Sequence, residues 1–146
     1  MIRRRLLLLL FLAAVLGDLH AAERRVVLVV SADSPIQELT PLDIQKVFLD
    51  LPVLREGRPL HPIRNLSEAS LDNIFLQYVV AMSQSAYDRR ILTQVLQQGR
   101  PRPLELRSRA EILDALTADR YAVTYMWLKD VPTTPRLRVL RVLWTE

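Results

Sequence analysis

The stretch Leu60–Met82, LHPIRNLSEASLDNIFLQYVVAM, organises the rest of the chain. We interpret it as a short strand, a polar connection and a long amphipathic helix. Its apolar residues recur at i, i+3, i+4, i+7, i+8 and i+11, which is one stripe of a 3.6-residue helix. They are Leu71, Ile74, Phe75, Tyr78, Val79 and Met82. Ser67 or Ser70 is expected to cap this helix, and Glu68 and Asp72 lie where carboxylates suit the positive end of the helix dipole.

Four polar residues at this strand-to-helix junction form a candidate anion-binding site: Arg64, Asn65, Ser67 and Ser70. A guanidinium at a strand exit, beside the free N–H groups of a helix start, has the chemistry to hold a small oxyanion. The alternative is an ordinary surface arginine with helix-capping serines. The residues alone leave both interpretations open.

Residues 1–22 are predicted to be a secretory signal peptide. Three arginines follow Met1-Ile2, an unbroken apolar run extends from Leu6 to Leu16, and small residues end the segment at Ala21-Ala22. The apolar run is shorter than the roughly 20 residues that span a bilayer, so the exported chain is not expected to cross a membrane. The chain has no cysteine, which excludes disulfides and a lipid-modified cysteine. We therefore expect a periplasmic protein with one domain, residues 23–146.

The predicted domain carries little excess charge. Removal of residues 1–22 takes away three arginines and one aspartate, so the formal net charge falls from +4 to +2. No concentrated basic surface remains that would indicate nucleic-acid binding. About 124 residues suffice for one hydrophobic core and are too few for two sizeable lobes.

The mature chain alternates strand and helix patterns. Val26–Val30 is a β-branched run typical of a strand buried on both faces. Thr40-Pro41-Leu42-Asp43 is a helix start, with threonine at the N-cap and proline at N1. Strands are also expected at Leu60–Arg64, Tyr121–Trp127 and Leu137–Leu143, the last with a bulge at Leu140–Arg141 or an edge position.

Two further helices complete the pattern. One begins at Ser83 or Ser85 and ends at Gly99, with an expected apolar face of Tyr87, Ile91, Leu92, Val95 and Leu96. The other begins at Ser108, with Glu111 completing a capping box. The order β-α-β-α-α-α-β-β predicts a single α/β domain of the three-layer type with a mixed sheet.

Catalytic and metal chemistry are not expected. His61 is the single histidine of the mature chain, and neither a second histidine nor a cysteine is present to complete a metal site. No nucleophile elbow, Ser-x-x-Lys or HExxH pattern occurs. We expect no enzyme activity and no cofactor, and we assign Trp127 and Trp144 to packing.

The order of short motifs resembles one lobe of the phosphate-binding periplasmic proteins, which have the type 2 solute-binding fold. The resemblance extends from Val26 to about Leu143. The matching residues are Leu39-Thr40 with Ile44, Val47-Phe48-Leu49, Glu56-Gly57, Leu60-His61-Pro62-Ile63-Arg64, Phe75, Gly99 with Pro103, and Val123-Thr124-Tyr125. The resemblance implies the fold, the periplasm and a substrate-binding role of the kind that serves ABC transporters.

Two functions remain open at this point. The first is weak binding of phosphate or another small oxyanion at the Arg64–Ser70 turn, as an accessory to transport or sensing. The second is an interaction module without a ligand, which docks on an envelope sensor or transporter. Its motivation is that Ala69-Ser70-Leu71 stands where the family has Ser-Gly-Thr, and that a second lobe is missing.

Overall fold

The computed structural model describes residues 24–133 and 136–146. The predicted signal peptide lies outside these residues. None of the helices in the described part of the chain combines the length and the apolar character that a membrane crossing requires.

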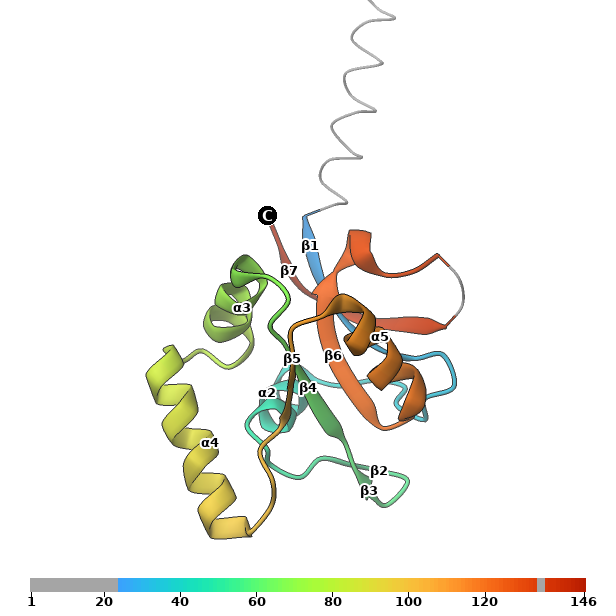
Figure 1. Cartoon of the computed structure of the whole chain (residues 1–146). Helices are drawn as coiled ribbons and strands as arrows, with labels where there is room; N and C mark the ends of the chain where they lie inside the picture. The colour runs from blue at the N-terminus through green and yellow to red at the C-terminus, as the bar shows by residue number, and fades with distance from the viewer. Residues whose placement is uncertain (1–23, 134–135) are drawn as a thin grey trace, which may run out of the picture.

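A five-stranded mixed sheet forms the centre of the molecule (Figure 1). Its strands are β1 (Arg25–Ser31), β4 (His61–Asn65), β5 (Leu104–Leu106), β6 (Ala122–Trp127) and β7 (Leu137–Thr145). Their spatial order is β5-β4-β6-β1-β7. β4 runs parallel to β5 and β6, whereas β1 runs antiparallel to β6 and β7. The predicted α/β class with a mixed sheet is confirmed.

Helices cover both faces of the sheet, which gives three layers. On one face lie α2 (Pro41–Phe48), α3 (Ala69–Ile74), the π-helical turn η1 (Phe75–Val79) and α4 (Gln84–Gln98), whose buried residues share one core cluster with Val26, Leu28 and Val30 of β1. On the other face lies α5 (Arg109–Ala118), which packs against Val27 and Val29. Alternate residues of β1 therefore feed two cores, as expected for a strand buried on both sides.

The predicted caps explain where the helices begin. Thr40 accepts a hydrogen bond from the Asp43 backbone N–H at 3.1 Å, and Asp43 reciprocates to the Thr40 backbone N–H at 3.2 Å. Ser83 caps α4 by accepting from the Ala86 N–H at 3.2 Å. α4 ends at Gly99, whose φ of 64° is the left-handed conformation that favours glycine.

The central helix departs from the predicted regular stripe. After Ile74 the chain makes the π-helical turn, in which the Val80 N–H donates to the Phe75 carbonyl at 3.2 Å. This wider turn changes the phase of the helix, so Phe75 and Val80 are both fully buried, whereas Tyr78 is 55% exposed. The prediction of Tyr78 as a core residue, and of a helix continuing to Met82, is wrong for this reason.

The apolar face predicted for the helix after Ser83 needs correction, and three short strands were not predicted. Leu92 and Leu96 of α4 are exposed. The helix meets the core through Tyr87 and Ile91, which are its buried apolar residues. Two strand segments were missed: β5, and a hairpin formed by β2 (Leu54–Arg55) and β3 (Arg58–Pro59). All three of these strands have only two or three residues, too few to show a period.

The last strand lies at an edge of the sheet, as one of the two predicted alternatives states. It also carries the predicted irregularity, because its pairing with β1 shifts between Leu28 and Val29, opposite Leu140. A second shift lies between Val26 and Val27, opposite Leu143.

Candidate functional site

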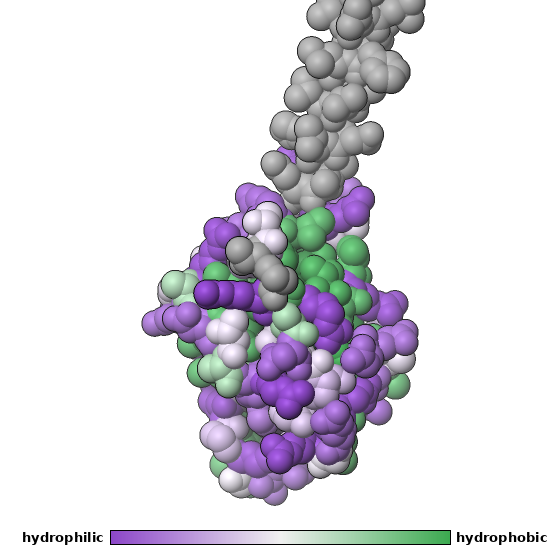
Figure 2. Space-filling view, turned by 90° about the vertical axis from the view of Figure 1, so that its right-hand side faces the viewer, coloured by the Kyte–Doolittle hydropathy of each residue, from purple (hydrophilic) through white to green (hydrophobic). Residues whose placement is uncertain are grey.

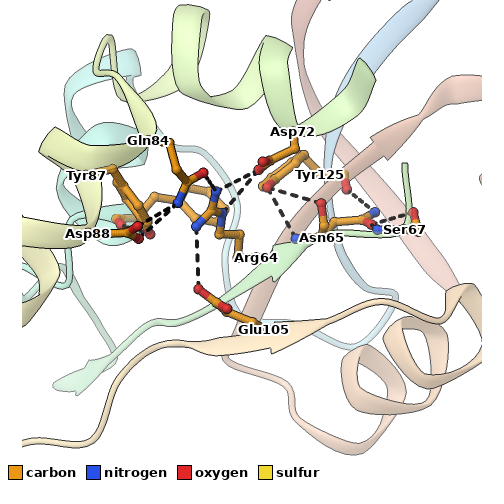
Figure 3. Close-up of polar contacts among 10 residues, drawn as sticks. Arg64, Asn65, Ser67, Asp72, Gln84, Tyr87, Asp88, Glu105 and Tyr125 are labelled. Atoms are coloured by element: carbon orange, nitrogen blue, oxygen red, sulfur yellow. Dashed lines mark hydrogen bonds and ion pairs between the residues drawn. The ribbon is translucent and has the colours of Figure 1, made fainter. Parts of the chain in front are cut away.

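The candidate site lies at the carboxyl end of β4, between β5 and β6 (Figure 3). Arg64 and Asn65 are the last two residues of β4, and α3 begins four residues after Asn65. In open α/β sheets, ligands bind outside the carboxyl ends of parallel strands. The location therefore agrees with the predicted site, and the side-chain contacts determine what it can bind.

Arg64 is almost completely enclosed, with 2% of its surface exposed. Its Nε and Nη2 donate to Asp72 Oδ1 at 3.2 and 2.8 Å, and Nη2 also donates to Gln84 Oε1 at 2.7 Å. Nη1 faces Glu105 Oε1 at 3.5 Å. The four polar contacts come from α3, α4 and β5, so this one guanidinium connects three elements.

Two aromatic rings pack against the same guanidinium. The Arg64 Cζ lies 4.7 Å from the Tyr87 ring centroid and 5.5 Å from that of Phe75, distances at which cation–π attraction operates. Burial lowers the pKa of Arg64, but the hydrogen bonds and charge of Asp72 outweigh burial, so the pKa lies above its usual value. Arg64 therefore stays charged, and its charge is balanced inside the protein.

Asn65 and Ser67 form a compact turn. Asn65 Nδ2 donates to the Tyr125 carbonyl at 2.9 Å, which ties β4 to β6. Asn65 Oδ1 accepts from the Ser67 backbone N–H at 3.0 Å and from its hydroxyl at 2.6 Å. Tyr125 Oη in turn accepts from the Asn65 backbone N–H at 3.2 Å, and burial raises the Tyr125 pKa well above the usual value. The polar atoms of these residues bond to one another.

The start of α3 differs from the prediction. Glu68 occupies the N-cap and makes no side-chain cap hydrogen bond, so neither Ser67 nor Ser70 caps the helix. The Glu68 carboxylate instead accepts from Trp127 Nε1 at 2.9 Å, and Ser67 bonds to Asn65. Ser70 is exposed in the first turn of α3. Asp72, expected to favour the helix dipole, also closes the ion pair with Arg64.

A polar cavity of about 410 Å³ opens beside the guanidinium. Its lining residues are Arg64, Leu66, Asp72, Gln84, Asp88, Arg102, Glu105 and Arg107. Three arginines thus face three carboxylates. An anion entering this cavity meets as many carboxylates as guanidinium groups, so the cavity does not favour anions by charge alone.

Several members of the site escaped the sequence analysis. Glu105 was missed because the short strand β5 was not predicted, and Gln84 because an exposed helix start carries no signal of a partner 20 residues away. The sequence analysis assigned Asp72 to the helix dipole and Tyr125 to a motif of the family resemblance, and neither to the site. The i-to-i+8 separation of Arg64 and Asp72 across a turn was the one available hint.

The remaining polar candidates do not extend the site. His61 lies at the opposite end of β4, where its exposed ring Nδ1 is 2.6 Å from Asp119 Oδ2. Within residues 24–133 and 136–146, no group of three or more His, Cys, Asp or Glu side chains is placed to hold a metal ion.

No protein-family model and no curated protein matches this sequence. Solved structures do resemble it. A putative phosphate ABC transporter substrate-binding protein with bound phosphate, from Clostridium perfringens, has a TM-score of 0.61 at 10% identity, over 81% of this chain and 44% of that chain. An ABC-type phosphate transport receptor from Vibrio cholerae has a TM-score of 0.59 at 8% identity, over 81% and 46%.

A third neighbour is a possible phosphate binding protein from Planctomyces limnophilus, with a TM-score of 0.56 at 12% identity, over 81% of this chain and 41% of that chain. At such low identity the similarity concerns the fold alone. The chain spans less than half the length of each of these neighbours. The expected likeness to one lobe of a periplasmic binding protein is confirmed for the fold.

Proposed function

We propose that this chain is an exported, non-catalytic domain of the binding-protein fold that docks on an envelope protein, such as a sensor or a transporter. The observation that carries the proposal is the occupied guanidinium. Arg64 already bonds to Asp72 and Gln84 and faces Glu105. An oxyanion would have to displace a carboxylate from a buried, charge-assisted pair, which is costly.

Exposed hydrophobic surface supports a docking role. Figure 2 shows hydrophobic residues gathered near the upper end of the molecule, where β1 begins in Figure 1, on a face that is otherwise mainly hydrophilic. Tyr78 and Val142, which line one groove, are 55% and 46% exposed. Contiguous apolar surface on a soluble domain tends to mark a partner site.

The periplasmic location is part of the same proposal. It rests on the leader-like composition of residues 1–22 and on a fold shared with ABC transporter substrate-binding proteins. N-terminal sequencing of the protein recovered from the periplasmic fraction tests it. A mature chain that begins near residue 23 supports export, and a protein that retains Met1 in the cytoplasm contradicts it.

A second candidate function is weak oxyanion binding at Arg64, Asn65, Ser67 and Ser70. It is favoured by one specific observation, the phosphate bound to a neighbour of the same fold. In this candidate, Ser70 and the backbone of the turn would supply donors, and Arg64 would exchange Asp72 for the ligand.

Calorimetric titration with phosphate, sulfate and small carboxylates separates the two functions. The docking proposal predicts no binding heat and no thermal shift at millimolar ligand. Saturable heat that is lost in both Arg64→Met and Ser70→Ala would support the oxyanion candidate and contradict ours.

Photo-crosslinking in living cells tests docking directly. A benzophenone amino acid placed in turn at the exposed positions Tyr78, Leu96 and Arg107 reports on three separate surfaces. A reproducible adduct with one envelope protein at any of these positions supports docking. No adduct at any position, in cells that express the protein at its natural level, contradicts it.

A further inference from the structure

β7 is the longer of the two edge strands of the sheet. β7 extends from Leu137 to Thr145 and is the last strand in the order β5-β4-β6-β1-β7, so no strand in the described part of the chain pairs with its outer side. Such an edge presents unpaired N–H and C=O groups to any extended chain that approaches. The pairing shifts opposite Leu140 and Leu143 bend this edge, which discourages indiscriminate sheet growth.

A groove lined by six apolar residues and one arginine lies against β7. It has a volume of about 210 Å³ and lies between α2, η1 and β7; we call it the β7 groove, and its lining residues are Pro41, Ile44, Tyr78, Val79, Arg141, Val142 and Leu143. Two of the lining residues, Tyr78 and Val142, have about half of their surface exposed. The dimensions suit one or two apolar side chains.

The charge along β7 has a single sign. The strand carries Arg138 and Arg141 and contains no carboxylate between Leu137 and Thr145. Arg138 turns back to donate to the carbonyls of Ser34 and Ile36, at 2.9 and 2.8 Å. Arg141 is exposed, lines the groove and forms no ion pair with any residue that the structure describes.

We propose that an extended segment of a partner protein, with an apolar and an acidic side chain two residues apart on one face of the strand, binds along β7. Its backbone pairs with the open edge, an apolar side chain enters the β7 groove, and a carboxylate pairs with Arg141. This mode combines backbone hydrogen bonds with a side-chain pocket, as in strand addition. The inference rests on the proposed docking function and names the surface and the chemistry of the partner.

Charge decides against a second copy of this chain as the occupant. Pairing two β7 strands would bring arginine-bearing strands together without a carboxylate between them, and like charges opposite each other destabilise a ladder. An acidic partner strand has the complementary charge.

Two matched peptides test the inference on isotopically labelled protein, purified as the cell produces it. Both are capped octapeptides that carry valine and the charged residue two positions apart, on one face of the strand: the glutamate peptide is Val-Thr-Glu-Thr-Val-Thr-Glu-Thr, and the lysine peptide has lysine in place of glutamate. NMR titration is expected to show saturable shifts of the amide signals within residues 137–145 with the glutamate peptide, and no saturation with the lysine peptide.

Variants identify the contacts. Arg141→Glu is expected to weaken binding of the glutamate peptide at least tenfold and to create binding of the lysine peptide. Arg89→Glu, at an exposed position on α4, makes the same charge change and is expected to alter neither affinity. Val142→Thr keeps the β-branched shape, removes apolar wall, and is expected to weaken the glutamate peptide as well.

Three results would overturn the inference: equal binding of both peptides, shifts that map away from β7, or no saturation by either peptide at millimolar concentration. Its failure is distinguishable from failure of the docking function. Photo-crosslinks at Leu96 or Arg107 without any at Tyr78 would leave docking intact and remove β7 as the surface.

Discussion

Replacing Asp72 by alanine removes the carboxylate that accepts two hydrogen bonds from Arg64, of 2.8 and 3.2 Å. The Arg64 side chain is 3% exposed, so water can reach these nitrogens only from the side of the polar cavity. Removing one partner of a buried ion pair costs about 3–5 kcal/mol. Gln84 at 2.7 Å remains as an acceptor, so we expect Asp72→Ala to cost about 3 kcal/mol, at the lower end of that range.

Arg64→Met is expected to cost less than Asp72→Ala. The Asp72 side chain is 21% exposed, so it can be hydrated once its partner is gone. Methionine fills part of the space between the rings of Phe75 and Tyr87, and the lost cation–π attraction is worth about 1–2 kcal/mol. The double variant should be more stable than Asp72→Ala alone, because it leaves no unpaired buried charge.

Equilibrium unfolding in urea, followed by tryptophan fluorescence, measures the free energy of unfolding of each variant. Asp88→Ala is the matched control, since Asp88 lines the same cavity but accepts from Gln84 instead of Arg64. Its cost should be below about 1 kcal/mol. Two results would refute the argument that Arg64 is held internally. One is an Asp72→Ala cost as small as that of Asp88→Ala. The other is an Arg64→Met cost larger than that of Asp72→Ala.

Three further predictions concern the surrounding fold. Phe75→Ala should cost about 3–5 kcal/mol by thermal or urea unfolding, because the ring is fully buried and stacks on Tyr125 at 4.8 Å; a cost below about 1 kcal/mol would mean that this stack is not part of the stable core. Thr40→Ala should cost about 1 kcal/mol by loss of the α2 cap, whereas Thr40→Ser should be close to neutral, and an equal loss in both would contradict the capping geometry. Burial raises the pKa of Asp50 and the charge of Arg100 opposes this rise, so the contribution of Asp50 to stability falls as pH rises from the unfolded to the folded pKa. Asp50→Asn should therefore be more stable than wild type at pH 7 and should lose that advantage below pH 3.8. A stability difference that does not vary with pH would contradict this linkage.

The sequence predicted best those elements whose signals are local. The apolar run at the first strand, the Thr40 cap and the glycine at Gly99 each depend on residues within one turn, and each appears where predicted. The π-helical turn was not foreseeable, because the spacing of Leu71, Phe75 and Tyr78 fits an ordinary α-helix.

The candidate site was located by sequence and its chemistry was not. The position of Arg64 at a strand exit is local information. Its neutralisation depends on Gln84 and Glu105, which reach it from α4 and β5 only through the tertiary fold. Asp50 illustrates the same limit: it adopts a left-handed φ of 58°, and its approach to Arg100 could not be read from the sequence.

The measurement that tests the central claim most directly is an NMR titration of the Arg64 Nε–H signal with phosphate. If the guanidinium is committed to Asp72 and Gln84, its shift should stay constant up to about 20 mM phosphate, a concentration far above any specific affinity in the micromolar range. A saturable shift of the Arg64 signal, accompanied by the Ser70 amide, would contradict the account and identify an oxyanion-binding domain.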